Sequence, residues 1–324
     1  MFNIFRKKKE TPYTPIIDEE KKEQNEKISE NKNVFHEPPT IIYESKNFKA
    51  ETIKLNSPPE EDSGLIVSVA SDTGKFRSSN EDNFYCDEIG YRTTENCSYK
   101  KKIRNRQKCI FAVCDGMGGE SYGELASQIA VETLAQSSHE INSSAPDKLH
   151  KTVNKYADEA NRRICEMAEE KLCNRSGSTL AMVCIADKYV YTFNIGDSRV
   201  YFFRDGKIKQ ITEDQTLAMR KLKANIYTEE EAKNSPDAHK ITSFLGVDDR
   251  RIGLNALEYK PFELGDGKIL ICSDGLTDMC SDEEITEILS SGCENYAEML
   301  VKKALDNGGK DNVTCVVIQK ITKG

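Results

Sequence analysis

The 324-residue chain lacks the features that would mark a membrane-spanning or nucleic-acid-binding protein. It contains no apolar run near the roughly 20 residues that a membrane-spanning helix needs. Its 46 Lys and Arg residues against 54 Asp and Glu residues give a net charge of −8. Binding to phosphate backbones depends mostly on Lys and Arg, so this balance argues against a general nucleic-acid binder. We therefore expect neither a transmembrane segment nor a nucleic-acid partner.

The chain also lacks any CxxC pair, although it contains eleven cysteines. An odd count without such a pair, in a chain with no secretory signal, argues against a disulfide framework and a zinc site. Six cysteines lie in or beside apolar runs, where a thiol acts as a small buried hydrophobe: Cys86, Cys109, Cys114, Cys184, Cys272 and Cys315. These observations predict free thiols and a reducing, cytoplasmic location.

Histidine is scarce, with only four residues, and each lies outside the motifs described below. This argues against a His-based nucleophilic triad and against His-ligated zinc. The histidines are His36, His139, His150 and His239. The composition, 37% hydrophobic and 31% charged, is that of a globular protein.

Two regions differ in character. Residues 1–62 are rich in Lys, Glu, Asn and Pro without periodicity, which predicts a disordered polar tail. Its first nine residues combine four apolar side chains with four cations, and an ordinary solvated terminus is favoured over a membrane contact. Residues 63–324 contain the apolar runs of a folded domain, including a polar excursion over 212–245 that is typical of a functional flap. Residues 88–108 are predicted to form a hairpin excursion. Its basic part, 100–108, could bind acidic partners, but we favour a solvated loop.

Aspartates stand at the ends of three predicted strands, next to a glycine or two residues from one. FAVCDGMGG places Asp115 after an apolar run, and its glycines allow the backbone to approach an ion closely, so that the Gly116 carbonyl is a second candidate ligand. KILICSDG places Asp274 in the same way, and Asp311 precedes the last strand. The adjacent pair Glu81–Asp82, on a fourth element, is either fully solvated or compensated by a cation.

Such strand ends can converge on one rim of a sandwich. Several hard oxygen donors without His or thiolate suit Mg²⁺ or Mn²⁺. A carboxylate-bridged pair of these ions activates water at neutral pH and neutralises a phosphoryl group. Arg77 has the planar fork that grips phosphate oxygens, and a salt bridge to the nearby carboxylates is compatible with that role.

Six ordered motifs between residues 77 and 314 resemble the metal-dependent serine/threonine protein phosphatases of type 2C, bacterial-type branch. They are RSSNED, VCDGMGG, GSTL, IGDSR, CSDGLTD and KDNVT. The resemblance covers about residues 64–321. It implies an α+β fold, a four-layer α-β-β-α sandwich with two central antiparallel sheets, and a catalytic domain over 63–324 that hydrolyses phosphoserine and phosphothreonine.

The resemblance also implies roles for single residues. Asp115 would bridge two Mn²⁺ or Mg²⁺ ions, the Gly116 carbonyl would bind one, and Asp274 and Asp311 the other. Arg77 would bind phosphate, so that Arg77, Asp115 and Asp274 form the catalytic set. The attacking water would act on phosphorus directly, without a phosphoenzyme intermediate.

Four further acids are implied ligands. Glu81 and Asp82 would act directly or through bound waters, and Asp197 and Asp278 match positions linked to a third, weaker metal. Met117 stands where many eukaryotic members have a histidine thought to be a general acid, so the leaving-group proton donor stays unassigned.

Two alternatives stay open. One is a catalytically inactive phosphatase-like domain that binds a phosphoprotein or regulator, although every expected acid is present. The other is a phosphatase restricted to one small regulator. The expected partners are phosphorylated proteins and an opposing serine/threonine kinase, and we expect a monomer.

Overall fold

The computed structural model of the protein describes residues 64–104, 108–118, 122–173, 176–247 and 254–321. The predicted tail over 1–62 lies outside these residues and stays a prediction. None of the helices within these ranges is long and apolar enough to cross a bilayer.

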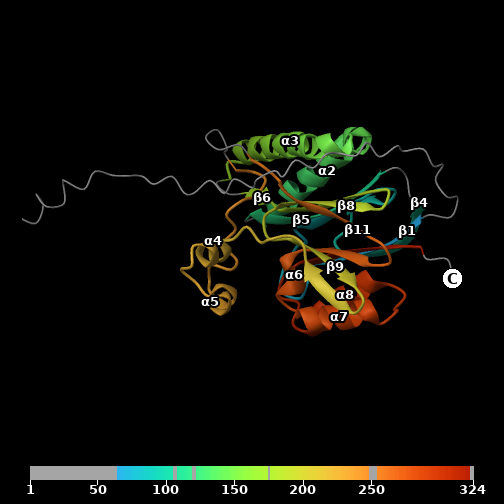
Figure 1. Cartoon of the computed structure of the whole chain (residues 1–324). Helices are drawn as coiled ribbons and strands as arrows, with labels where there is room; N and C mark the ends of the chain where they lie inside the picture. The colour runs from blue at the N-terminus through green and yellow to red at the C-terminus, as the bar shows by residue number, and fades with distance from the viewer. Residues whose placement is uncertain (1–63, 105–107, 119–121, 174–175, 248–253, 322–324) are drawn as a thin grey trace, which may run out of the picture. The chain divides into compact units, whose positions relative to one another are not determined.

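Two antiparallel sheets face each other at the centre of the domain (Figure 1). The order in the first sheet is β10 (Lys207–Gln210), β9 (Arg199–Arg204), β12 (Lys268–Cys272), β13 (Val313–Lys320), β1 (Gly64–Asp72) and β4 (Cys97–Arg104). The order in the second is β11 (Leu257–Glu263), β8 (Tyr189–Ile195), β7 (Leu180–Ala186), β5 (Lys108–Gly118), β2 (Asp82–Cys86) and β3 (Gly90–Tyr91), with β6 (Ser176–Ser178) paired to β5.

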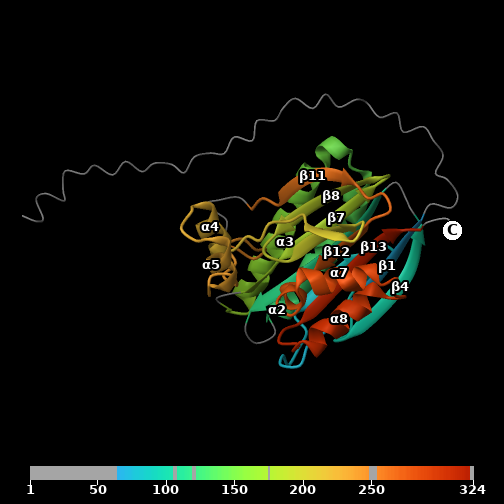
Figure 2. The same ribbon diagram turned by 60° about the horizontal axis from the view of Figure 1, so that its bottom comes forward.

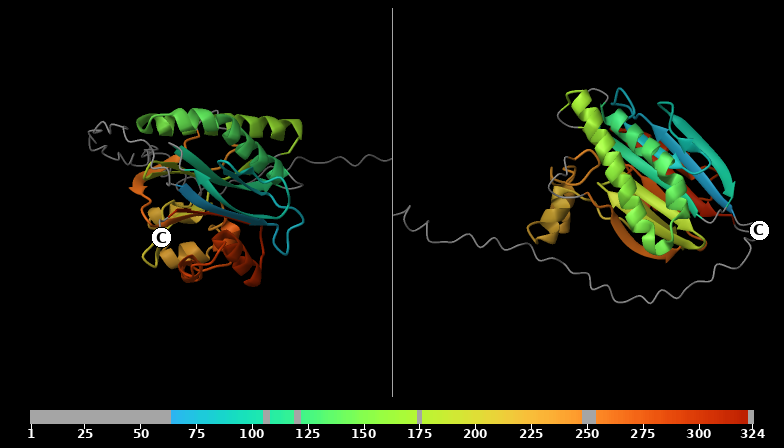
Figure 3. Two further views of the ribbon diagram at one scale, coloured as in Figure 1. Left: turned by 90° about the vertical axis from the view of Figure 1, so that its right-hand side faces the viewer. Right: turned by 90° about the horizontal axis from the view of Figure 1, so that it is seen from above.

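Helices cover the outer face of each sheet (Figures 2 and 3). The second sheet is covered by α2 (Tyr122–Ser143) and α3 (Leu149–Glu170), with a 3-10 turn at Pro146–Lys148 between them. The first is covered by α6 (Asp274–Thr277), α7 (Asp282–Ser290) and α8 (Tyr296–Asp306). The predicted four-layer sandwich is therefore confirmed. Two short helices, α4 (Leu217–Lys223) and α5 (Glu229–Asn234), form the excursion predicted as a flap.

The strand sequences explain the layers. Along β5, Ile110 and Ala112 pack toward α2 and α3, whereas Phe111 and Val113 pack between the sheets. Successive side chains on a strand point to opposite faces, and here both faces are buried. The central strands therefore appear in the sequence as unbroken apolar runs. None of the eleven cysteines forms a disulfide within the described residues, and the six predicted to be buried are buried.

The structure corrects the prediction for residues 88–108. The described part of the basic stretch, up to Arg104, is a strand and not a solvated loop: β4 pairs with β1 in eight antiparallel positions, from Cys97↔Ser71 to Arg104↔Gly64. Seven of its eight residues are exposed or half-buried and Ile103 is buried, so no apolar alternation marked it as a strand. A second correction concerns β5, which continues through Asp115 to Gly118 instead of ending at Asp115.

Candidate metal centre

Asp82 and Asp115 are direct cross-strand partners on β2 and β5. The Asp82 side chain is buried, with 1% of its surface exposed. Its Oδ2 accepts a 2.7 Å hydrogen bond from Ser273 Oγ, whereas its buried Oδ1 has no hydrogen-bond partner among the described residues. An unpaired buried carboxylate oxygen is costly, and a bound cation would remove that cost. The pair therefore fits a cation site.

Asp274 and Asp311 reach the same place from the other sheet. Asp274 is the second residue after β12, and Asp311 is the second residue before β13. These two strands are neighbours in the first sheet. The Asp274 charge acts on the Asp115 carboxyl group and raises its pKa. The two sheets thus bring four aspartates to one end of the sandwich.

Burial and mutual repulsion shift the pKa values of these carboxyl groups. Burial, followed by repulsion from Asp274 and Asp311, raises the pKa of Asp82 to about 7 despite hydrogen bonds from Ser273 and Thr314. Burial and the nearby acids raise the pKa of Asp274 to about 6. The same causes raise the pKa of Asp115 well above its ordinary value. Divalent cations would reverse this preference for the protonated forms.

Glycines allow the backbone around Asp115 to pack closely. A Cβ on Gly116 would lie 2.1 Å from the Gly123 carbonyl oxygen and 2.5 Å from that of Glu81. A Cβ on Gly123, in the first turn of α2, would lie 2.8 Å from the Glu81 carboxyl carbon. Position 116 therefore requires glycine, because its neighbours are backbone atoms, whereas a Cβ on Gly123 would displace the end of the half-buried Glu81 side chain.

Asp197 and Asp278 also lie at this end. Asp197, in the turn between β8 and β9, is 6% exposed, and its buried Oδ1 lacks a hydrogen-bond partner within the described ranges. Asp278 ends α6, with Oδ2 3.6 Å from Nδ1 of His239. One potential ligand atom from each of His239, Asp274 and Asp278 lies within 4.8 Å of the others.

His239 lies outside the six motifs, as the sequence analysis states, and no motif assigned it a role at this site. His239 belongs to the flap, 35 residues before Asp274 in the chain, and only the folded structure brings it to the site. It is an exposed side chain that faces Asp278 from the flap.

Arg77 lies at the solvent edge of the cluster. Its Nη2 is 2.6 Å from Oδ2 of Asp311, the salt bridge considered from the sequence. About half of the Arg77 side chain, 49%, is exposed. The guanidinium is therefore oriented by Asp311 while remaining accessible to an incoming anion.

Three residues that the sequence analysis did not single out orient the acids. Ser273 holds Asp82, as described above. Thr179 Oγ1 accepts a 2.9 Å hydrogen bond from the Asp115 N–H and lies 2.6 Å from Ser198 Oγ. Asn312 Oδ1 accepts a 2.8 Å bond from the Glu81 N–H. All three lie inside the six motifs, so the motifs themselves were the available signal.

Comparison with known proteins decides the family. A sequence model of the family described as protein phosphatase 2C matches residues 96–307. The chain belongs to the protein phosphatase 2C family. It is 31% identical over 255 residues to the serine/threonine phosphatase stp of Listeria innocua, covering 77% of this chain and 94% of the relative.

Solved structures of protein phosphatase 2C relatives agree with this fold. The crystal structure of the Mycobacterium tuberculosis serine/threonine phosphatase PstP/Ppp is similar with a TM-score of 0.65 and 31% identity, over 79% of this chain and 98% of that one. The catalytic domain of PstP in complex with two manganese ions gives a TM-score of 0.64 and 30% identity, over 80% of this chain and 100% of that one.

In this protein phosphatase 2C domain the flap is tied to the turn that carries Asp197. The Gln215 N–H donates to the Gly196 carbonyl at 3.0 Å, and its side chain accepts from the Gly196 N–H at 3.3 Å. Thr242, at the other end of the flap, donates its N–H to the Gln215 carbonyl at 2.7 Å. Gln215 therefore links both ends of the flap to the acidic site.

Proposed function

We propose that this chain hydrolyses phosphoserine and phosphothreonine in proteins with Mn²⁺ or Mg²⁺. The observation that carries the proposal is the convergence of carboxylates from both sheets, with buried Oδ1 atoms of Asp82 and Asp197 that have no hydrogen-bond partner in the described part of the chain. Membership of the family and the serine/threonine phosphatases among its relatives support the same activity.

The proposed ligands of two cations are oxygen donors from both sheets: Glu81, Asp82, Asp115, the Gly116 carbonyl, Asp274 and Asp311. Asp197 and Asp278 would hold a third, weaker ion. When bound, such ions supply a water activated at neutral pH and positive charge for the phosphoryl group. The donor set, oxygen atoms with one nearby imidazole, suits Mn²⁺ or Mg²⁺.

Arg77 would bind the phosphate of the substrate. Its exposed guanidinium is held by Asp311, so part of the conformational cost of fixing a long side chain is already met. The fork can donate two parallel hydrogen bonds to phosphate oxygens. Arg77 would therefore orient the phosphoryl group beside the carboxylates.

The cellular setting is also part of the proposal. Eleven cysteines without a disulfide among the described residues support a reducing, cytoplasmic location. We propose that the protein acts as a monomer in signalling, against serine/threonine kinases, with phosphorylated proteins as its substrates.

Turnover of p-nitrophenyl phosphate and of a phosphothreonine peptide by the full chain, with Mn²⁺, Mg²⁺ or EDTA, tests the activity. The proposal predicts hydrolysis of both substrates with either metal and none with EDTA. Binding of the phosphopeptide without turnover under any metal would instead favour the catalytically inactive alternative.

A further inference from the structure

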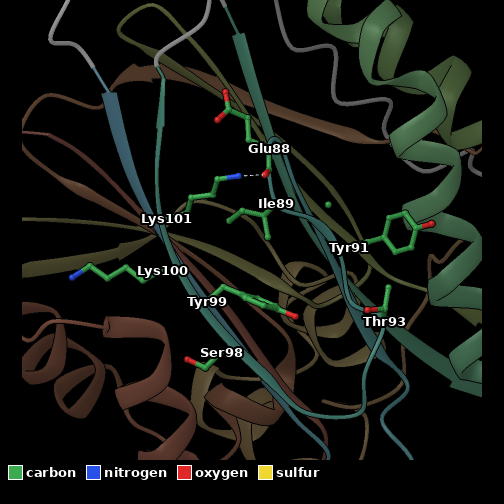
Figure 4. Close-up of a pocket in the computed structure, with 9 residues that line it drawn as sticks. Glu88, Ile89, Tyr91, Thr93, Ser98, Tyr99, Lys100 and Lys101 are labelled. Carbon is green, nitrogen blue, oxygen red and sulfur yellow. Dashed lines mark hydrogen bonds between the residues drawn. The ribbon is translucent and has the colours of Figure 1, made fainter.

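A cavity of about 660 Å³ opens at one edge of the sandwich and shares no lining residue with the carboxylate cluster. It lies between β3 and β4, the terminal strands of the two sheets (Figure 4). We call it the edge groove. Its lining residues are Glu88, Ile89, Gly90, Tyr91, Thr93, Ser98, Tyr99, Lys100 and Lys101.

The backbone of β4 borders the edge groove. Four consecutive residues, 98–101, line it although alternate side chains point in opposite directions. Ser98 and Lys100 point away from the groove, and they contact Glu298 and Glu294 of the α8 region at 3.2 and 3.5 Å. Among the described strands, β4 pairs with β1 and ends its sheet. Its other edge can therefore pair with an added strand, a common mode of peptide recognition.

The interior of the groove offers an apolar platform. Tyr99 is 41% exposed, and its ring meets the buried Phe84 ring edge-on with centroids 6.4 Å apart. Ile89 lies beside it and also points into the space between the strands (Figure 4). Gly90 has φ +93°, and a Cβ built there would meet nothing within 4 Å. An extended segment could therefore enter without displacing protein atoms.

The free edge of β4 is locally basic in a chain of net charge −8. Lys100, Lys101, Lys102 and Arg104 are exposed. Only Lys101 of these extends into the groove, where its amine donates to the carbonyl of Glu88, whereas the other three lie on the opposite face of the same strand. Lysines on an edge strand also prevent edge-to-edge aggregation between like copies. The same charges would attract an acidic strand, so charge complementarity selects an acidic occupant.

A second hollow adjoins the edge groove. It measures about 320 Å³ and shares Thr93 with the edge groove. Its other lining residues include Glu95 and Glu124, and the Glu124 charge acts on Glu81. Gly90 pairs with Cys86, four residues along β2 from Asp82, or about 13 Å at the usual rise of a strand. About four extended residues would span this distance.

From these observations we propose that the edge groove binds an acidic, extended segment of the phosphoprotein substrate by strand addition to β4. The inference rests on the proposed phosphatase activity and specifies its substrate class. The acidic residues lie about four or more positions from the phosphorylated residue. The residues between them are neutral or basic, because Glu95 and Glu124 line the intervening hollow.

The test uses three phosphothreonine peptides with a neutral four-residue linker followed by an acidic, a neutral or a basic tail. The full-length wild type is compared with Lys101→Glu/Lys102→Glu. The matched control is Lys207→Glu/Lys209→Glu, two exposed lysines on β10 at the opposite edge of the same sheet. Turnover of p-nitrophenyl phosphate reports the chemistry alone. Fluorescence anisotropy of labelled peptides in EDTA reports binding without turnover.

For the wild type and the control, the acidic tail should lower both the KM and the Kd from anisotropy by about tenfold relative to the neutral tail. The double variant should lose or reverse this preference while retaining p-nitrophenyl phosphate turnover and thermal stability. An acidic peptide N-methylated at alternate tail residues should bind weakly, because it cannot pair with a strand. Equal binding of the three tails, or the same loss in the β10 control, would overturn the proposal. Absence of p-nitrophenyl phosphate turnover would count against the phosphatase activity. The anisotropy measurement would still show whether the edge groove binds the acidic tail.

Discussion

The hydroxyl of Ser273 donates a 2.7 Å hydrogen bond to Asp82 across the two sheets. Both side chains are buried, and Ser273 also accepts a 3.0 Å bond from the N–H of Thr314. This contact fixes one oxygen of Asp82 and leaves the other toward the carboxylate cluster. It therefore joins the packing of the sandwich to the geometry of the proposed metal site.

Replacing Ser273 should weaken metal binding. Ser273→Ala removes the hydrogen bond to Asp82 Oδ2 and the one accepted from the Thr314 N–H, at a cost of about 1–3 kcal/mol in unfolding free energy. Loss of a residue that orients a ligand typically lowers metal affinity about 10- to 100-fold. Isothermal titration with Mn²⁺ measures this, with Ser291→Ala, an exposed helix-end serine, as the control. Unchanged Mn²⁺ affinity in Ser273→Ala would contradict the orienting role.

Arg77 should be sensitive even to a conservative change. Arg77→Lys retains the positive charge but loses the fork that can bind two phosphate oxygens. We expect kcat/KM for a phosphothreonine peptide to fall about 10- to 100-fold, with Mn²⁺ affinity nearly unchanged. Arg162→Lys, an exposed arginine on α3 paired with Glu159 and Glu166, is the matched control. Equal kcat/KM in Arg77→Lys and wild type would contradict the assignment of Arg77 to phosphate binding.

The raised pKa values predict how pH affects the metal-free protein. The pKa of Asp82 is raised to about 7 and that of Asp274 to about 6, above the ordinary value of 3.8. Between about pH 4 and pH 7 the folded state therefore holds more protons than the unfolded state, so its stability falls as pH rises. Thermal unfolding in EDTA should show this fall, and Mn²⁺ should stabilise the protein more at pH 7.5 than at pH 5.

Asp274→Asn is the control for that pH dependence. It removes one titrating group, so the loss of stability between pH 5 and pH 7.5 in EDTA should be smaller than in wild type. An equal or steeper loss in the variant would show that other groups dominate this pH range.

The flap has its own polar anchor. Asp237 is 6% exposed and accepts hydrogen bonds from Lys221, from Lys240 at 2.7 Å and from the Tyr227 hydroxyl at 3.0 Å. Asp237→Asn should loosen the flap, because it removes the charge that holds both lysines. Hydrogen exchange over 217–240 should become faster and KM for a phosphopeptide should rise several-fold, while p-nitrophenyl phosphate turnover stays near normal.

The control for the flap is Glu263→Gln, which breaks an exposed pair with Lys188 on another part of the surface. It should leave both the exchange rates and the peptide KM unchanged. Slow exchange in Asp237→Asn would mean that backbone contacts alone hold the flap.

Local sequence patterns predicted much of the fold and of the acidic cluster. Apolar runs ending near Asp115 and Asp274 marked the central strands, and the motifs placed the acids at strand ends. The strand β4 was missed because SYKKKIR has no apolar alternation, and its pairing with β1 is a tertiary event. His239 was missed for the same kind of reason, since the base of the flap, closed at Gln215 and Thr242, brings it to Asp278.

The central claim is that aspartates from both sheets form one catalytic metal site, and Asp115→Asn and Asp274→Asn test it most directly. Mn²⁺-dependent hydrolysis of a phosphothreonine peptide is measured for each variant beside wild type, with thermal unfolding to check the fold. Both variants should remain folded, because each substitution relieves repulsion, and turnover should fall by at least about 100-fold, since each carboxylate would hold a metal. Near-normal metal-dependent turnover in either variant would contradict the assignment.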